Sequence, residues 1–231
     1  MGKTLVLLQP SYLPWSGAFN QMDSADVFVI YNDAQYTKND WRNRNRIKTA
    51  QGIQWLTVPV FKDGFPLIKD VLIDNSDNWK VKHLKSIKQN YSRAPYFAEY
   101  IPIFEDIYSK TWKYLLDLDM AFILVLRKAL CIEAQIEFSS SLELKGNRIE
   151  KLVDCCIKCG ATEFLEGHAG KSYLQGEGEQ LFKENGINLV YQDYNHPVYP
   201  QLYGAFVSHL SVIDLLFNCG GNSLNIIRSG V

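Results

Sequence analysis

A histidine in a loop stiffened by prolines is the best candidate for a general base in this chain. His196 directly follows a predicted strand, within the segment Asn-His-Pro-Val-Tyr-Pro-Gln that begins at residue 195. The two prolines restrict the backbone and hold the imidazole in place, and the ordinary pKa of histidine lies close to neutral pH. We therefore expect His196 to accept a proton from an attacking group, and Tyr199 and Gln201 of the same loop to bind the substrate.

A run of alternating arginines and asparagines, Arg-Asn-Arg-Asn-Arg, begins at Arg42. Alternate side chains of an extended strand share a face, so Arg42, Arg44, Arg46 and Lys48 are predicted to form one cationic surface. Guanidinium groups pair with phosphate oxygens, which favours a diphosphate ligand, with Trp41 stacking on a base or a sugar. The competing interpretation is a charged, solvated face of a hairpin.

Another candidate binding segment joins the first predicted strand to the first predicted helix. It contains Gln9, Tyr12, Trp15 and Gly17, and it lies where open α/β sheets bind ligands and where a helix N-terminus favours anions. Its position resembles the HxGH loop of adenylyl-transferring enzymes, but a proline and a tryptophan stand where that loop has histidines. This difference disfavours adenylyl transfer by that mechanism. A tight turn packed by Tyr12 and Trp15 is the structural alternative.

Two carboxylates could assist the base. Asp33 follows the second predicted strand together with Gln35, and both could face the same crevice as hydrogen-bonding groups or, for Asp33, as a base. Asp214 lies in an apolar predicted helix, where a buried carboxylate needs partners. The alternatives are a turn-forming Asp33 and an Asp214 that caps a loop or pairs with a cation. The histidines of the predicted helices, His83 and His209, are expected to pack.

Two further motifs are incomplete. The segment Gly-His-Ala-Gly-Lys-Ser from residue 167 lacks the first glycine of a phosphate-binding loop, so Lys171 and the glycines of this segment remain only weak candidates for binding an anion. Cys156 and Cys159 have the spacing of zinc ligands, but no second pair follows, and both fall in a helical pattern. Packing explains these cysteines better than a metal site, so no metal is expected, and a cysteine nucleophile paired with His196 stays open as an alternative.

These segments need a sheet that brings strand ends together, and the hydrophobic pattern predicts one. Short apolar runs bounded by turns predict buried strands, and longer runs with helical periodicity predict helices. Their alternation indicates an α/β fold with a mostly parallel, Rossmann-like sheet, an added β-hairpin, and a helical insertion near residues 78–132, all within a single domain over residues 1–231. The predicted strands are residues 5–8, 27–31, 71–73, 136–139, 163–166 and 189–194, the hairpin strands are 42–49 and 54–60, and the helices are 15–22, 78–91, 101–109, 112–130, 148–159, 178–185 and 206–218.

The overall composition excludes several classes of protein. The 231 residues carry a net charge of −1, and 47% of them are hydrophobic, which is typical of a globular protein. The lack of a basic excess argues against a nucleic-acid partner. The longest apolar segment, residues 120–126, is too short to span a membrane, and no secretion signal precedes the first strand. We expect a cytoplasmic protein without membrane insertion, and the sequence leaves the oligomeric state open.

Four segments together resemble one protein family. They are Gln-Pro-Ser-Tyr-Leu-Pro-Trp from residue 9, Asp-Ala-Gln-Tyr from residue 33 with the tryptophan–arginine run from residue 41, Ala-Pro-Tyr-Phe from residue 94, and His-Pro-Val-Tyr-Pro-Gln from residue 196 with the apolar segment that follows. The chain is similar to the WbqC-like proteins of bacterial polysaccharide gene clusters over almost its whole length. The resemblance implies a role in surface-glycan biosynthesis and the attachment of an acyl or aminoacyl group to a nucleotide-linked amino sugar. It carries over no catalytic residues.

The residues and the resemblance together favour a transferase that acts on a nucleotide-linked sugar and uses an acyl or aminoacyl donor. In this hypothesis the arginines hold the diphosphate, His196 takes the proton, and Asp33 or Asp214 orients the imidazole. The glutamines of the candidate segments hydrogen-bond the sugar or the developing oxyanion. Two alternatives stay open: an adenylate-forming or nucleotidyl-transfer enzyme, and a nucleotide-sugar binding protein without chemistry.

Overall fold

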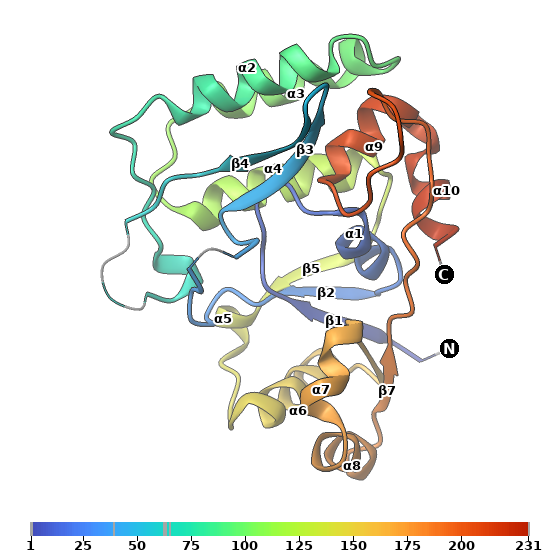
Figure 1. Cartoon of the computed structure of the whole chain (residues 1–231). Helices are drawn as coiled ribbons and strands as arrows, with labels where there is room; N and C mark the ends of the chain where they lie inside the picture. Colours follow the sequence, from blue (N-terminus) through green and yellow to red (C-terminus); the bar gives the residue numbers. More distant parts are fainter. Residues whose placement is uncertain (1, 39, 62–63, 65, 231) are drawn as a thin grey trace.

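A parallel sheet and a separate hairpin organise the chain. The computed structural model describes residues 2–38, 40–61, 64 and 66–230. Over these residues, five parallel strands form one sheet and two antiparallel strands form a hairpin, as the sequence predicts (Figure 1). The strands of the sheet are, in spatial order, β5 (Gln135–Phe138), β2 (Val27–Ile30), β1 (Thr4–Leu8), β6 (Glu163–Glu166) and β7 (Asn188–Tyr191).

The central strands are apolar throughout because helices cover the sheet on both faces. Successive side chains of a strand point to opposite faces, so Leu5 and Leu7 pack on the side of α6, whereas Val6 packs into the larger core on the other side. Continuous apolar runs are what a parallel sheet covered on both faces requires. The first side carries α6 (Arg148–Cys159), α7 (Lys171–Leu174) and α8 (Glu177–Glu184), and the second carries α1 (Ser16–Asp23), α4 (Leu115–Ala129), α9 (Val212–Cys219) and α10 (Ser223–Arg228) (Figure 1).

The hairpin consists of β3 (Arg44–Thr49) and β4 (Gly52–Thr57). Helices α2 (Trp79–Tyr91) and α3 (Phe97–Ser109) lie beyond it, away from the sheet (Figure 1). Together with α4 they fall in the stretch where the sequence predicts a helical insertion. Short helical turns complete the described chain: η1 (Ile68–Asp70), α5 (Ser139–Leu142), η2 (His168–Gly170) and η3 (Gly220–Asn222).

The alternation predicted for the arginine run holds within β3, where Arg44, Arg46 and Lys48 share a face, whereas Arg42 lies in the turn before the strand. Asn45 and Ile47 are buried, whereas Arg44 and Arg46 are only partly buried and lie on the opposite face. Lys48 lies on the arginine face as predicted, but it is only 3% exposed and adds no cation to the surface. Its Nζ donates hydrogen bonds to Gln201 Oε1 (3.1 Å) and to the carbonyl oxygen of Ala205 (2.6 Å), so the loop after β7 covers it.

Two predicted elements are wrong. The segment from residue 71 to 73 forms only isolated bridges, because its partners are single residues of neighbouring loops. The helix predicted over residues 206–218 begins only at Val212, where the Ser211 hydroxyl accepts the backbone N–H of Ile213 and caps the helix. The backbone of His209 has a φ of 58°, which is left-handed and incompatible with a helix. His209 therefore lies in a loop, not in the apolar helix where the sequence places it.

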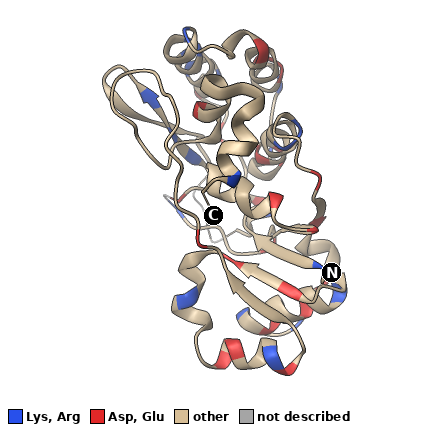
Figure 2. Ribbon diagram, turned by 90° about the vertical axis from the view of Figure 1, so that its right-hand side faces the viewer, with Lys and Arg blue, Asp and Glu red and all other residues tan. Residues whose placement is uncertain are grey.

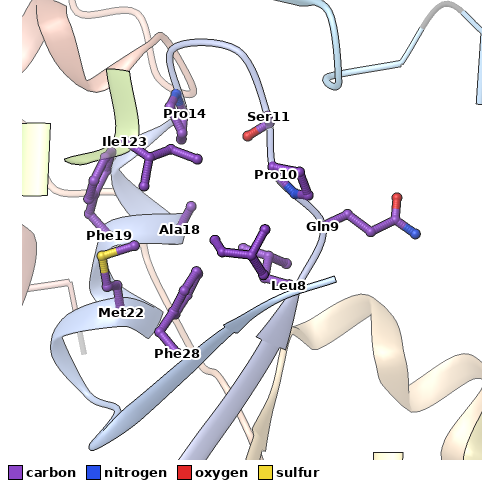
Figure 3. Close-up of a pocket in the computed structure, with 11 residues that line it drawn as sticks. Leu8, Gln9, Pro10, Ser11, Pro14, Ala18, Phe19, Met22, Phe28 and Ile123 are labelled. Carbon is purple, nitrogen blue, oxygen red and sulfur yellow. The ribbon is translucent and has the colours of Figure 1, made fainter. Parts of the chain in front are cut away.

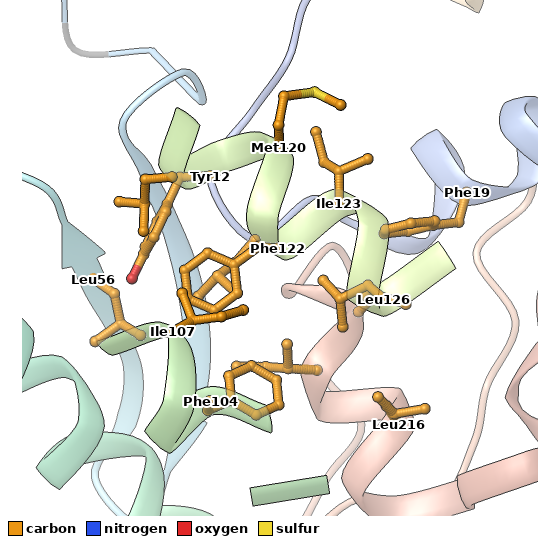
Figure 4. Packing of buried hydrophobic residues seen from close by; sticks show 14 of the residues in the cluster. Tyr12, Phe19, Leu56, Phe104, Ile107, Met120, Phe122, Ile123, Leu126 and Leu216 are labelled. Atoms are coloured by element: carbon orange, nitrogen blue, oxygen red, sulfur yellow. The ribbon is translucent and has the colours of Figure 1, made fainter. Parts of the chain in front are cut away.

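The larger core contains one of the predicted site residues. Tyr12 is fully buried beside Phe122, and its hydroxyl is hydrogen-bonded to Tyr108 and, at 2.9 Å, to His83 Nδ1. Figure 4 shows the ring of Tyr12 among the side chains of α3, α4 and the hairpin. The structure thus makes Tyr12 a packing residue that anchors the loop after β1 to the helical insertion, which is the structural alternative considered for this segment.

Candidate active site

A cleft of about 460 Å³ opens at the carboxyl edge of the sheet, between the ends of β1 and β6. The chain passes from β1 to β2 and β5 on one side and then places β6 and β7 on the other side of β1. Open α/β sheets bind ligands at such a switch point, because the connections from the two strand ends diverge there. The described residues that line the cleft are Leu8, Gln9, Ser11, Trp15, Ala18, Gln21, Trp41, Arg42, Gly167, His168, Ala169, Gln192, Tyr194 and His209.

The loop after β1 directs Gln9 away from the core. Below the loop lies a void of about 10 Å³ with apolar walls that include Phe19 and Phe28. Such a volume is at the lower limit for a single water molecule, so the void is a packing gap and not a ligand site. Figure 3 shows the apolar side chains gathered around this void and Gln9 extending away from it. Because Gln9 also lines the cleft, its amide is available to hydrogen-bond a ligand there.

Trp15 forms one wall of the cleft and depends on the glycine two residues later. A Cβ atom at Gly17 would lie 2.2 Å from atoms of the Trp15 indole, so only glycine lets the ring lie against the start of α1. The indole stacks on the imidazole of His209, with ring centroids 5.2 Å apart, and meets the Tyr194 ring edge-on. Gln192 Nε2 donates to the carbonyl oxygen of Gly17 (3.0 Å), which ties the end of β7 to the same wall.

His209 lines the cleft and belongs to the loop before α9, whereas His168 lines it from the segment after β6. Arg46 Nη2 donates to its carbonyl oxygen (2.8 Å), and Ser208 Oγ lies 2.8 Å from its Nδ1. Partial burial lowers the pKa of the His209 imidazole, and the positive charge of Arg46 lowers it further. The ring is therefore neutral at pH 7. No hydrogen bond of the described residues engages its Nε2, which leaves a group that can accept or donate a proton.

His196 lies behind this wall and does not line the cleft. Its ring stacks near Trp15 and lies 5.3 Å from the His209 ring, centroid to centroid. Nδ1 lies 3.1 Å from the carbonyl oxygen of Pro197 and must donate to it, so Nε2 accepts the hydroxyl of Ser16 at 3.1 Å. Burial lowers the pKa of His196 and keeps it neutral. Both ring nitrogens are thus engaged by protein groups, and the imidazole supports the wall of the cleft.

Arg42 supplies the positive charge inside the cleft. One of its guanidinium nitrogens lies 3.4 Å from Asp40 Oδ2. Burial lowers its pKa from the ordinary value, with Asp40 and Asp119 opposing the shift, so the group stays charged at pH 7. Asp119 of α4 is fully buried behind it, and neither carboxylate oxygen has a hydrogen-bond partner among the described residues. Burial raises the pKa of Asp119 well above the ordinary range, with Arg42 opposing.

The outer rim of the cleft continues onto the hairpin. Trp41 lines the cleft and its ring contacts that of Trp55, with centroids 5.4 Å apart. The guanidinium of Arg44 lies 4.5 Å from the centroid of Trp55, and that of Arg46 lies between 5.3 and 5.6 Å from both tryptophans. Basic segments are visible on the hairpin in Figure 2. We call Trp41, Arg44, Arg46 and Trp55 the arginine–tryptophan patch.

Of the predicted site residues, only Gln9, Trp15, Trp41 and Arg42 line the cleft; Asp33, Gln35 and Lys171 are among those that lie elsewhere. Asp33 follows β2, one strand further along the edge, and its carboxylate accepts the hydroxyl of Ser139. Gln35 is exposed and its backbone forms an isolated bridge with Leu67. Lys171 is exposed at the start of α7, with its ammonium group 5.3 Å from the ring of Tyr191. The structure therefore brings Gln9, Trp15, Trp41 and Arg42 together, but not these three.

Asp214, Tyr199 and Gln201 form the buried support of the loop that follows β7. Asp214 is fully buried and accepts hydrogen bonds from the hydroxyls of Tyr91 (2.8 Å) and Tyr199 (2.9 Å). Burial raises the pKa of Asp214, and the hydrogen bonds of these two phenols oppose the rise. Gln201 Oε1 accepts from Lys48 Nζ and from the backbone N–H of Val207. These groups fix the loop that carries both His196 and His209, so their role is to position the cleft wall.

The site predicted from the sequence omits several residues of the cleft. His209 is missed because the apolar pattern extends the predicted helix through it; the N-capping preference of Ser211 indicates the true start. His168, Gln192 and Tyr194 follow β6 and β7, and their position at strand ends is the signal that applies to them.

Comparison with known proteins identifies the family. The model of the WbqC-like protein family matches residues 9–226. The chain belongs to the WbqC-like family. An uncharacterized protein, Rv1507c of Mycobacterium tuberculosis, is 37% identical over 230 residues, which cover 98% of this chain and 98% of that protein. No solved structure matches the chain.

This WbqC-like protein combines three chemical functions in one cleft: a cation, the neutral imidazole of His209, and amide or phenol groups that donate hydrogen bonds. Tyr194 stays protonated because burial raises its pKa. Within the part of the chain that the structure describes, no cluster of three or more His, Cys, Asp or Glu side chains could hold a metal ion. None of the described helices combines the length and apolar character needed to cross a membrane.

Proposed function

We propose that this WbqC-like protein is a transferase of surface-polysaccharide biosynthesis that moves an acyl or aminoacyl group onto the amine of a nucleotide-linked amino sugar. The observation that carries the proposal is the combination, at the switch point of a parallel sheet, of the Arg42 guanidinium with the neutral His209 imidazole. A cation alone would support binding only, whereas a neutral imidazole beside it supports proton transfer.

The cationic side of the cleft is suited to the diphosphate. Arg42 lines the cleft, and Arg46 reaches it through its hydrogen bond to the His209 carbonyl. Guanidinium groups bind phosphate oxygens in pairs and keep their charge when partly buried. The sugar would then lie toward the glutamines, where Gln9 and Gln192 line the cleft and can hydrogen-bond hydroxyl groups.

The imidazole side is suited to the chemistry. In the proposed step the sugar amine attacks the acyl carbonyl, a C–N bond forms, and the bond between the carbonyl carbon and the donor's leaving group breaks. His209 Nε2 takes the proton that the amine loses and passes it to the leaving group or to solvent. An amide N–H of Gln9 or Gln192 stabilises the negative charge on the carbonyl oxygen. The role that the sequence assigns to His196 passes to His209, because both nitrogens of His196 are engaged.

The test begins with thermal-shift measurements on nucleotide-linked amino sugars, CoA thioesters and ATP. The proposal expects a nucleotide amino sugar to raise the melting temperature and an acyl donor to be consumed when both are present. A shift with ATP alone would instead favour an adenylate-forming enzyme, and a shift with the sugar nucleotide but no turnover with any donor would favour a binding protein.

Two variants then separate the roles of the cation and the imidazole. Arg42→Ala should weaken binding of the sugar nucleotide by about 1.5–3 kcal/mol, the range for a charge-assisted hydrogen bond. His209→Gln keeps hydrogen bonding but cannot carry the proton, and should lower turnover on the order of 10²–10⁴-fold with little change in binding. Arg93→Ala is the matched control, since Arg93 is an exposed arginine after α2 and does not line this cleft. Normal turnover of His209→Gln would refute the assignment of the base.

A further inference from the structure

The arginine–tryptophan patch is unusual because two large aromatic rings lie in solvent side by side. Trp41 is 41% exposed and Trp55 is 43% exposed, although both could be buried in a protein with a core of this size. Their rings are in contact and tilted by 35° relative to each other. Contiguous exposed apolar patches often mark binding sites, and aromatic residues are enriched at such sites. Two adjacent exposed indoles therefore indicate a binding surface.

The cations of the patch lie against the faces of the tryptophan rings. The guanidinium of Arg44 lies over Trp55, and that of Arg46 lies beside both rings. Guanidinium planes and indole faces together form a stacking platform with positive charge at its edge. Such a platform selects a ligand that is flat and aromatic at one end and anionic next to it.

The patch is continuous with the cleft. Trp41 belongs to both, and Arg46 joins them because its Nη2 donates to the carbonyl oxygen of His209 in the cleft wall. In the hairpin Arg46 is directly opposite Trp55. Arg42 lies in the turn before β3, next to Trp41, and both of these residues line the cleft, so the patch begins beside Arg42. An extended nucleotide that enters the cleft at Arg42 is long enough to reach the patch.

We propose that the patch is the subsite for the nucleobase of the nucleotide-linked substrate, with the base stacked on Trp55 and Trp41. The diphosphate then lies along Arg46 and Arg42, and the sugar lies inside the cleft beside Gln9 and His209. This inference rests on the proposed function and adds to it the recognition of the base and the direction in which the substrate lies. Stacking on the patch distinguishes a nucleotide sugar from a sugar phosphate, which has no base. It discriminates poorly among bases, because every base has an aromatic face.

The experiment compares the binding of nucleoside diphosphates with that of inorganic pyrophosphate by isothermal titration calorimetry. UDP, dTDP and GDP carry both the base and the anion, whereas pyrophosphate carries only the anion. Trp55→Ala should weaken the tightest-binding nucleoside diphosphate by between about 5-fold and 100-fold, the effect expected from the loss of one stacked base. It should change pyrophosphate binding less than twofold. Trp55→Phe should restore most of the affinity, since it keeps an aromatic face.

A matched control lies on the same strand. Ile53 is 46% exposed and is two residues from Trp55 on the same face of β4. Ile53→Ala therefore removes exposed apolar surface of the hairpin without removing an aromatic ring, and should leave nucleoside diphosphate binding unchanged. Melting temperatures of the variants within a few degrees of the parent protein would verify that the hairpin still folds.

The outcomes separate this inference from the proposed function. If a nucleoside diphosphate binds and Trp55→Ala binds it equally well, the base subsite is refuted and the proposed function stands. If none of the three nucleoside diphosphates binds the parent protein, both are refuted. Equal loss of pyrophosphate and nucleotide binding would show that Trp55 only positions the arginines. A concentration-dependent dimer that Trp55→Ala abolishes, or a single-stranded oligonucleotide that binds far more tightly than UDP, would assign the patch to another partner and also overturn the inference.

Discussion

Replacing Gly17 by alanine should move one wall of the cleft. The added Cβ would lie 2.2 Å from two ring carbons of Trp15. Carbon atoms in ordinary contact are about 3.5 Å apart or more, so the indole must move by about 1.3 Å. That movement is opposed by the rings that pack on Trp15, chiefly His209 at 5.2 Å and Tyr194 at 5.6 Å.

The size of the effect follows from two opposing contributions. Overpacking of this kind typically costs about 1–3 kcal/mol, whereas alanine in a helix is more stable than glycine by up to about 1 kcal/mol. Gly17→Ala should therefore destabilise the parent protein. In a Trp15→Ala background the clash is absent, and the same substitution should stabilise the protein. The sign of the effect thus reverses between the two backgrounds.

Urea denaturation of the four proteins in this double-mutant cycle measures the reversal. A coupling energy of about 1–3 kcal/mol between the two positions is expected, and for a chain of this length a loss of 1 kcal/mol lowers the melting temperature by about 2–4 °C. The affinity for the sugar nucleotide should fall in Gly17→Ala, because the displaced indole narrows the cleft. If Gly17→Ala stabilises the protein in both backgrounds, the Trp15 indole does not pack against Gly17, and this arrangement of the cleft wall is refuted.

Two further predictions concern the buried groups that hold the site. Tyr199→Phe removes a phenol donor from the Asp214 carboxylate and should lower the free energy of unfolding by about 1.5–3 kcal/mol; Tyr203→Phe, which loses a hydrogen bond to a neutral carbonyl oxygen, should cost less in the same urea titration. Burial raises the pKa of Asp119, so this carboxyl resists ionisation in the folded chain. In the unfolded chain it ionises near pH 4, and its contribution to the stability of the parent protein therefore decreases as the pH rises above that value. Asp119→Asn cannot ionise, so its stability relative to the parent should increase between pH 4 and pH 8; a constant difference across this range would contradict the neutral, buried carboxyl.

Local patterns explain why most of the fold was predictable. The strands β1 and β2 are continuous apolar runs, and α6 begins at a capping asparagine and ends at a glycine, so the residues that define each element lie within it. The alternation of arginine and asparagine placed Arg44 and Arg46 on one face of β3, because the period of a strand is two wherever the strand lies. Gln9 directly follows β1, and its position at the carboxyl edge of the parallel sheet predicts that it faces a cleft there.

Local patterns could not show what covers a side chain. Tyr12 and Lys48 have the residue types of ligand-binding groups, yet both are buried because segments distant in the sequence, α3 and the loop after β7, close over them. Asp214 was predicted to need partners, and the partners proved to be phenols of α2 and of that same loop.

The sequence by itself determined the order of the elements, the faces of the strands and the cationic character of β3, because these depend on residues a few positions apart. Only the tertiary structure decided that His209 lines the cleft and that His196 does not. The apolar run before α9 has a helical pattern. The backbone N–H of Ser211, however, donates to the carbonyl oxygen of Arg46, 165 residues away in the sequence, and this contact keeps the preceding residues in a loop. His209 is exposed to the cleft for this reason. His196 is turned inward because Ser16 and Pro197 satisfy both of its ring nitrogens.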